Sequence, residues 1–238
     1  IEMMSLMLKY QGFKQLEIKK LGNRFKIELH GLPGYTYNKL HVFTLYTGTE
    51  EKEVKEYIRN IYNSDFNKLP SYMIDELKTL YNLDELDNIR GDIINLLMIT
   101  ASGAEGIDLQ NTRMVHITEP YWHYVRIEQV IGRARRICSH SRLPKEEQDV
   151  QVYIYISELK DDNKMISTDE FLYKIMNEKH MLSESFLNTL KESAIDCVSP
   201  NKCFKFPNKE KRNRVYELDY KKEPQQKKKR NKEFMNYY

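Results

Sequence analysis

Apolar and polar positions recur with two different spacings along the chain, and these spacings predict helices and strands in alternation. Residues 1–10 place apolar side chains closely enough to predict a mostly buried helix, which Gly12 would end. Residues 41–46 predict a strand, and Thr49 is then expected to cap a helix that extends to about Tyr62. The apolar face of that helix would carry Val54, Tyr57, Ile58, Ile61 and Tyr62.

The apolar pattern continues through the middle of the chain after a polar stretch, residues 63–92, where we expect a loop and a short helix. The continuous apolar run 96–99 is typical of a central parallel strand that is covered on both faces. Strands separated by helical segments predict an α/β domain with a largely parallel sheet. The remaining predicted elements are strands at 113–118 and 150–156, a helix at 124–137, and a helical region from a capping Ser167 to Cys197 with a break near Ser183.

A small, glycine-containing turn follows the apolar run, at residues 101–106. Ligands bind at such places in open α/β sheets, because strand ends leave backbone N–H groups free and glycine permits close approach. A tight turn without any ligand explains the same residues, so both interpretations stay open at this point.

The predicted helix 124–137 carries candidate phosphate ligands. At about 100° per residue, Gln129, Arg133 and Arg136 fall within about 60° of one another, beside an apolar stripe. Arginine suits bidentate phosphate contact because its fork is rigid and always charged. Gly132 costs about 0.5–1 kcal/mol relative to alanine inside a helix, which indicates close packing or a close partner. The alternative is a basic face in contact with solvent.

Two stretches in this region resemble motifs of superfamily II helicases. Residues 100–109 (TASGAEGIDL) are similar to motif V, and residues 129–136 (QVIGRARR) are similar to motif VI. The flanking EPYW at 119–122, CSH at 138–140 and AIDC at 194–197 resemble the branch of nucleocytoplasmic large DNA viruses. That branch includes poxvirus nucleoside triphosphatase I and the small subunit of the viral early transcription factor, and it resembles Snf2-type translocases more distantly.

The resemblance implies a three-layer, RecA-like α/β domain, the C-terminal one of two, and assigns roles within it. Arg133 and Arg136 would be arginine fingers that reach the β- and γ-phosphates, and Gln129 would couple the nucleotide to domain closure. Thr100, Ser102 and Trp122 would contact nucleic acid, although Trp122 is also explained by core packing of an aromatic cluster. The residues implied near the cofactor are Gly103, Glu105, Gly106, Asp108 and Gly132.

The sequence contains no Gly-x-x-x-x-Gly-Lys-Ser/Thr motif and no convincing Asp-Glu-x-His motif. In the helicases that it resembles, those motifs belong to a first RecA-like domain. We therefore expect ATP and Mg²⁺ to be bound mainly by an N-terminal helicase domain of a longer protein. This chain alone is expected not to hydrolyse ATP.

Charge divides the chain unevenly and suggests its partners. The predicted domains are a RecA-like domain at 1–158, a helical extension at 159–199 and a basic, mostly disordered tail at 200–238. The tail has 13 basic and 5 acidic residues, a charge of +8, whereas the rest carries −5. This tail is expected either to contact phosphates of DNA or RNA or simply to aid solubility. The N-terminal helicase domain is an expected partner, viral RNA polymerase is a further candidate, and no apolar run is long enough to span a membrane.

The cysteine content argues against a disulfide framework and against a metal site. Three cysteines fit a reducing compartment, and Cys197 and Cys203 with His180 lack the paired spacing of a zinc site. His116 and His140 are expected to be packed or hydrogen-bonded rather than catalytic. The resemblance places the protein in the virion and the host cytoplasm, at the viral factory.

Two rival functions remain open from the sequence. One is a Snf2-type translocase that moves on duplex DNA without separating strands, and the other is a non-enzymatic remnant that binds nucleic acid. The intact Gln129, Arg133 and Arg136 argue against the remnant.

Overall fold

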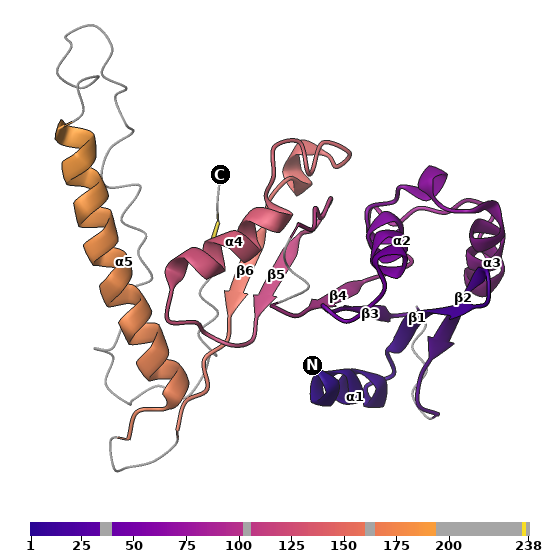
Figure 1. The fold of residues 1–238 in the computed structure, drawn as a ribbon, viewed down its shortest axis with the longest axis horizontal. Helices are drawn as coiled ribbons and strands as arrows, with labels where there is room; N and C mark the ends of the chain where they lie inside the picture. The colour runs from indigo at the N-terminus through magenta and orange to yellow at the C-terminus, as the bar shows by residue number, and fades with distance from the viewer. Residues whose placement is uncertain (34–39, 102–105, 160–164, 194–234, 237–238) are drawn as a thin grey trace, which may run out of the picture. The chain divides into compact units, whose positions relative to one another are not determined.

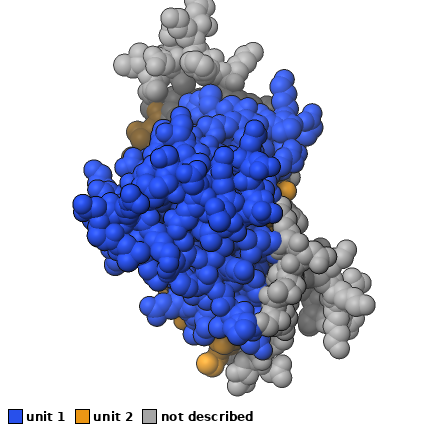
Figure 2. Space-filling view, turned by 90° about the vertical axis from the view of Figure 1, so that its right-hand side faces the viewer, with its two compact units in different colours: residues 1–113, 130–150 blue, residues 114–129, 151–238 orange. Residues whose placement is uncertain are grey.

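The structure is a computed structural model, and it describes residues 1–33, 40–101, 106–159, 165–193 and 235–236 (Figure 1). The chain divides into two compact units, which Figure 2 colours differently. Unit 1 contains residues 1–113 and 130–150, and unit 2 contains residues 114–129 and 151–238. The α/β class is confirmed. The described strands form two sheets rather than one, and three of their five pairings are parallel.

Unit 1 is built on a four-stranded sheet with the order β2-β1-β3-β4. Parallel pairing joins β1 to β3 and β3 to β4, whereas β1 and β2 are antiparallel. The predicted strands at 41–46 and 96–99 are therefore confirmed. The four strands are β1 (Lys14–Leu21), β2 (Arg24–His30), β3 (Val42–Tyr46) and β4 (Leu96–Ile99).

The β1–β2 hairpin was not predicted from the sequence. Its strands meet through a two-residue turn at Gly22 and Asn23, with Gly22 at a φ of +62°. A glycine with positive φ at the first turn position suits a tight hairpin. The inward-facing side chains of the two strands alternate with polar ones and are buried: Leu16, Ile18, Phe25 and Ile27.

The exposed face of this hairpin carries a cross-strand set of charges. The register aligns Glu17 with Glu28 and Lys19 with Lys26, so like charges stand directly opposite one another. One ion pair between the strands and one within β2 offset this repulsion, because the Glu28 carboxylate lies 3.0 Å from the ammonium groups of Lys19 and Lys26. Hydrogen bonds from Lys19 and Lys26 lower the pKa of Glu28 to about 2.

Helices α2 (Lys52–Tyr62) and α3 (Ser71–Tyr81) lie on one side of this sheet, and α1 lies on the other (Figure 1). A short 3₁₀ turn, Phe66–Lys68, and α3 confirm the predicted loop and short helix. The apolar face predicted for α2 is confirmed, with Ile58 and Ile61 buried in the core. The predicted cap at Thr49 is wrong. The Glu50 carboxylate accepts a hydrogen bond from the Thr47 amide at 2.8 Å, and the helix begins only at Lys52.

Helix α1 (Glu2–Tyr10) forms where the pattern predicted it, but its predicted burial is wrong. Ser5 is the buried residue of this helix, whereas Met3, Leu6 and Met7 are exposed. The serine hydroxyl contacts the side chain of Gln15 on β1. The closely spaced apolar residues thus predicted the helix correctly, but they predicted its burial incorrectly.

Helix α4 (Tyr124–Ala134) ends short of Ile137, the end expected from the sequence. Its last carbonyl groups find partners outside the helix: the Leu109 amide donates to the Arg133 carbonyl at 3.3 Å, and the Ser139 hydroxyl to the Ala134 carbonyl at 3.0 Å. The chain then turns through Cys138, which has a φ of +63°. Arg136 therefore lies beyond the helix. The prediction that it shares a helical face with Gln129 and Arg133 is wrong.

Unit 2 contains the sheet β5-β6-β7, in which β5 and β6 are parallel and β7 is antiparallel to β6. The predicted strands at 113–118 and 150–156 are confirmed with slightly shorter bounds. Two residues of the predicted tail form β7, and the rest of that tail lies outside the described residues. The strands are β5 (Met114–Ile117), β6 (Gln151–Ile154) and β7 (Met235–Asn236).

The long helix of unit 2 is α5 (Thr168–Ser193). Its predicted cap is confirmed, because the Ser167 hydroxyl accepts from the Glu170 amide and the Glu170 carboxylate accepts from the Ser167 amide. The predicted break near Ser183 is wrong, since the helix is continuous there. Within the described part of the chain, no helix combines the length and the apolar character that crossing a membrane requires.

Candidate functional site

The segment that resembles motif V begins at the end of β4. The Thr100 amide donates to the Tyr46 carbonyl at 3.2 Å, which keeps this residue in line with the parallel strand pair β3–β4. Ser102, Gly103 and Glu105 lie outside the described residues. Gly106 has a φ of +73°, and no neighbouring atom would touch a Cβ placed there, so its backbone conformation rather than space favours glycine.

The chain after this turn is hydrogen-bonded to the end of α4 and to the segment that follows it. The Leu109 amide binds the Arg133 carbonyl, and the Asn111 amide donates to the Ser139 carbonyl at 2.9 Å. His140 completes the row, with Nε2 lying 2.7 Å from the Thr112 carbonyl. Residues 108–112 and the exit from the motif VI-like helix are therefore held side by side.

Asp108 and Arg136 face each other within this row. Asp108 Oδ1 lies 3.3 Å from Arg136 Nη1, which is ion-pair distance. The contact lacks hydrogen-bond geometry, and Oδ1 is a buried oxygen with no hydrogen-bond partner among the described residues. The structure thus brings together one predicted residue from each motif and leaves one carboxylate oxygen able to accept a donor.

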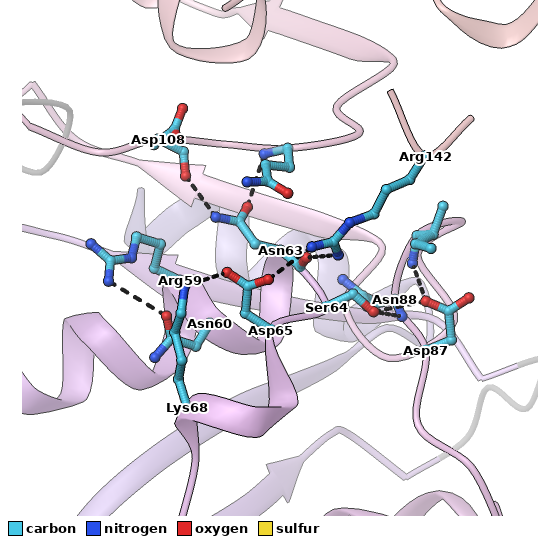
Figure 3. Close-up of polar contacts among 12 residues, drawn as sticks. Arg59, Asn60, Asn63, Ser64, Asp65, Lys68, Asp87, Asn88, Asp108 and Arg142 are labelled. Carbon is cyan, nitrogen blue, oxygen red and sulfur yellow. Dashed lines mark hydrogen bonds and ion pairs between the residues drawn. The ribbon is translucent and has the colours of Figure 1, made fainter. Parts of the chain in front are cut away.

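The C-terminal end of α2 supports this row from the other side (Figure 3). The Asn63 side chain donates to the Asp108 carbonyl at 2.9 Å and accepts from the Gln110 amide at 2.8 Å. Arg142 donates to the Asn63 carbonyl and to Asp65, each at 3.0 Å. We call these contacts the α2 junction. It comprises Asn63, Asp65, Arg142 and residues 108–110.

Charge is balanced within the α2 junction at Asp65. Burial alone would raise the pKa of this carboxyl group, but hydrogen bonds from Lys68 and Arg142 hold its pKa below the ordinary value. The carboxylate therefore remains ionised at neutral pH and keeps the Arg142 guanidinium in place.

The two histidines considered in the sequence have structural partners, as predicted. His140 is buried, and its Nε2 must be the donor to Thr112 because a carbonyl group only accepts. His116 Nδ1 lies 2.9 Å from the Tyr155 hydroxyl, and its ring stacks on Tyr153 with centroids 4.9 Å apart. Neither histidine is placed as a catalyst by these contacts.

Gln129 and Arg133 lie one turn apart on α4, with Gln129 exposed and Arg133 half-buried. The close packing expected at Gly132 is not observed, since no described atom lies within 4 Å of a Cβ built there. The residue therefore leaves open space on the helix surface. The predicted catalytic roles of Gln129, Arg133 and Arg136 and the predicted cofactor contact of Gly132 remain predictions.

Trp122 belongs to an aromatic cluster between the start of α4 and α5. The residue is 39% exposed, and the Lys179 ammonium group lies over its ring, 4.0 Å from the ring centroid. Nearby, the rings of Tyr124 and His180 pack in a tilted arrangement, with ring centroids 4.0 Å apart. The ring of Trp122 is therefore partly engaged in packing α5, and its predicted contact with nucleic acid remains a prediction.

Two guanidinium groups, those of Arg133 and Arg136, lie at the end of α4 and just after it. Guanidinium groups bind phosphate oxygens well, and their predicted contact with a nucleotide stays a prediction. Among the described residues no group of three or more histidine, cysteine, aspartate or glutamate side chains could hold a metal, and Cys197 and Cys203 lie outside that part of the chain.

Sequence reasoning missed Asn63 and Arg142. Both lie outside the motif-like stretches, and their contacts join residues far apart in the chain. A short local signal existed only for Asn63, because asparagine is common at helix ends.

Comparisons with known proteins match part of this site to a family. Residues 35–138 match the family described as "Helicase conserved C-terminal domain". The chain is 36% identical over 198 residues to the "Putative ATP-dependent RNA helicase" of Acanthamoeba polyphaga mimivirus, covering 71% of this chain and 24% of that protein.

Two further relatives come from African swine fever virus and from the same mimivirus. The "Termination factor NPH-I homolog" of African swine fever virus is 31% identical over 204 residues, which cover 79% of this chain and 26% of that relative. Another mimivirus protein with the name "Putative ATP-dependent RNA helicase" is 33% identical over 190 residues, covering 79% of this chain and 29% of its own length. The chain thus spans about a quarter of the length of these relatives.

Proposed function

We propose, from the premise that residues 35–138 belong to the helicase conserved C-terminal domain family, that this chain is the C-terminal part of an ATP-dependent motor acting on nucleic acid. Its role would be to complete a nucleotide site that another domain of the same protein begins. The motor would separate DNA or RNA strands, or translocate along them, during viral transcription.

The observation that carries this proposal is the joining of the two motif-like segments around Asp108 and Arg136. A guanidinium group at that position can meet charge that develops on a phosphate, while Asp108 follows directly from the glycine turn. Bound ATP would supply the transferable phosphoryl group, with Mg²⁺ neutralising its charge. Arg133 and Arg136 would act as arginine fingers, and Gln129 would link them to domain closure.

The relatives support the nucleic-acid and viral parts of the proposal. Two are named as RNA helicases and one as a termination factor, and all three come from large DNA viruses. We infer a transcription role, with nucleic acid and viral RNA polymerase as partners and the virion and host cytoplasm as locations. The basic tail from Pro200 onward is proposed to add phosphate-backbone contacts.

The test measures ATP hydrolysis with and without DNA or RNA in the full-length protein and in its Arg133→Ala and Arg136→Ala variants. We expect stimulated hydrolysis in the unaltered protein and a fall in kcat of about 10²-fold or more in each variant. Arg135→Ala is the control, because Arg135 has no assigned role. This variant should turn over ATP normally.

The same assay on the isolated 238-residue chain should show no stimulated hydrolysis, because the phosphate-binding motif is absent from its sequence. Stimulated turnover by this chain would refute the division of the active site between two domains. Normal kcat in both arginine variants would show that these side chains are structural.

A further inference from the structure

We propose that Asn63 and Arg142 are positioning residues that fix Asp108 and Arg136 relative to each other. The inference rests on the proposed function, but it concerns residues that neither motif contains. Its basis is the α2 junction, where one helix end binds the exits of both motif-like segments (Figure 3).

Asn63 acts on the motif V side. Its side chain is 4% exposed, and its amide pairs with the backbone of Asp108 and Gln110 as a neighbouring strand would. A buried amide with both of its polar atoms satisfied holds a loop in one conformation, because breaking either bond would leave a buried polar group without a partner. The backbone of Asp108 is therefore fixed by Asn63.

Arg142 acts on the motif VI side. Successive turns connect it to Arg136: the Ser139 amide binds the Arg136 carbonyl, and the Ser141 amide binds the Cys138 carbonyl. Its guanidinium fork then spans the Asn63 carbonyl and the Asp65 carboxylate. A planar fork can satisfy two acceptors at once, which a lysine ammonium group on a flexible chain does less well.

Because both segments are anchored at one residue, a shift at Asn63 is passed to Asp108 and, through Arg142, to the turn that carries Arg136. Displacements of about 1 Å in a catalytic arrangement can cost about 10²-fold in rate. The α2 junction would therefore affect turnover without touching the nucleotide.

Asn88 offers a matched control. It is 3% exposed, donates to the Tyr62 carbonyl at 2.9 Å, and accepts from the Ile93 and Ile94 amides at 2.9 and 2.8 Å. It contacts neither 108–112 nor 136–142 through any of these bonds. Replacing either asparagine by aspartate removes one donor to a backbone carbonyl and retains the acceptor, so both variants should lose similar thermal stability.

Arg90, whose guanidinium group donates to the Glu147 carboxylate at 3.1 Å, is the control for Arg142. The experiment compares Asn63→Asp with Asn88→Asp, and Arg142→Ala and Arg142→Lys with Arg90→Ala, all in the full-length protein. Hydrogen exchange should accelerate at residues 106–113 and 133–143 in the Asn63 and Arg142 variants, and not in the controls. Stimulated kcat should fall about 10- to 100-fold, with KM for ATP changed less than kcat. Arg142→Lys should retain more activity than Arg142→Ala.

Three outcomes would overturn the proposal. Exchange that is no faster than in the controls would mean that the contacts do not hold these segments. Faster exchange with kcat equal to that of the controls would show a purely structural junction, and an equal fall in kcat in Asn88→Asp would show a general loss of stability. If the unaltered protein hydrolyses no ATP, the proposed function fails, and the exchange measurement alone decides whether the junction holds the two segments.

Discussion

Helices α2 and α5 were both predicted from apolar spacing, yet one packs in a core and the other is largely exposed. Ile61 on α2 is fully buried, whereas Phe186 on α5 is 65% exposed. Most residues in the second half of α5 are exposed as well. Helix α2 also ends in a polar junction that holds two distant segments, while α5 is fixed mainly at its start by Ser167, Tyr173 and Met176. The comparison teaches that apolar spacing specifies a helix but does not specify what covers it.

The largest expected effect comes from the buried side of this comparison. Ile61→Ala should lower the free energy of unfolding by about 2–5 kcal/mol, because it leaves a cavity in the core of unit 1. Ile61→Val should cost only about 0.5–1.5 kcal/mol. Denaturant unfolding of the chain measures both changes. A loss below about 1 kcal/mol for the alanine variant would mean that α2 is not packed as described.

Loss of the α5 cap should have a smaller effect. Ser167→Ala removes the hydroxyl group that accepts from the Glu170 amide, and it should destabilise the helix by about 0.5–2 kcal/mol. Far-UV circular dichroism during thermal unfolding measures the change. Ser183→Ala on the same helix is the matched control and should be neutral or slightly stabilising, since alanine favours a helix interior. Equal destabilisation in both variants would contradict the capping role.

Acid should weaken both the α2 junction and the start of α5. The pKa of Asp65 is lowered, so its stabilising contribution is present above the unfolded-state value near 3.8 and is lost as the pH falls through the lower folded-state value. Hydrogen bonds from the Ser157 side chain and amide lower the pKa of Asp169, in the first turn of α5. Unfolding measured across this acidic range should become less pH-dependent in Asp65→Asn and in Asp169→Asn than in the unaltered chain. An unchanged pH dependence in either variant would refute the role of that carboxylate.

The smallest effect is expected on the exposed half of α5. Phe186→Ala should change the free energy of unfolding of the chain by no more than about 0.5 kcal/mol, because the ring is already in contact with solvent. The denaturant experiment used for Ile61 provides the direct comparison. A loss of several kcal/mol would show that something covers this face in solution and would remove the contrast between the two helices.

The sequence predicted those parts of the fold that depend on local spacing. The apolar face of α2 and the continuous run of β4 were read correctly because burial there follows the periodicity. The β1–β2 hairpin was overlooked although Gly22 and Asn23 separate two alternating stretches, which is a usable signal. Exposure on α1 could not be read from spacing, since the same spacing also fits a buried helix.

The candidate site was predicted only in part, for a related reason. Motif-like residues such as Asp108 and Arg136 were named from the sequence, and the structure brings these two together. The end of α4 was misplaced because it depends on Leu109 and Ser139, which satisfy its last carbonyl groups from outside the helix. Asn63 and Arg142 act through contacts that span many residues, and local pattern reasoning does not detect such contacts.

The charged hairpin face has a consequence for how the chain behaves when it is newly made and concentrated. Among the described strands, β2 forms an outer edge of its sheet, and such an edge exposes backbone groups to which a strand of another molecule can bind. Lys26 and Glu28 are tied into ion pairs along that edge, so an added strand would have to strip water from charges and disturb those pairs. We infer that these charges disfavour aggregation through sheet extension.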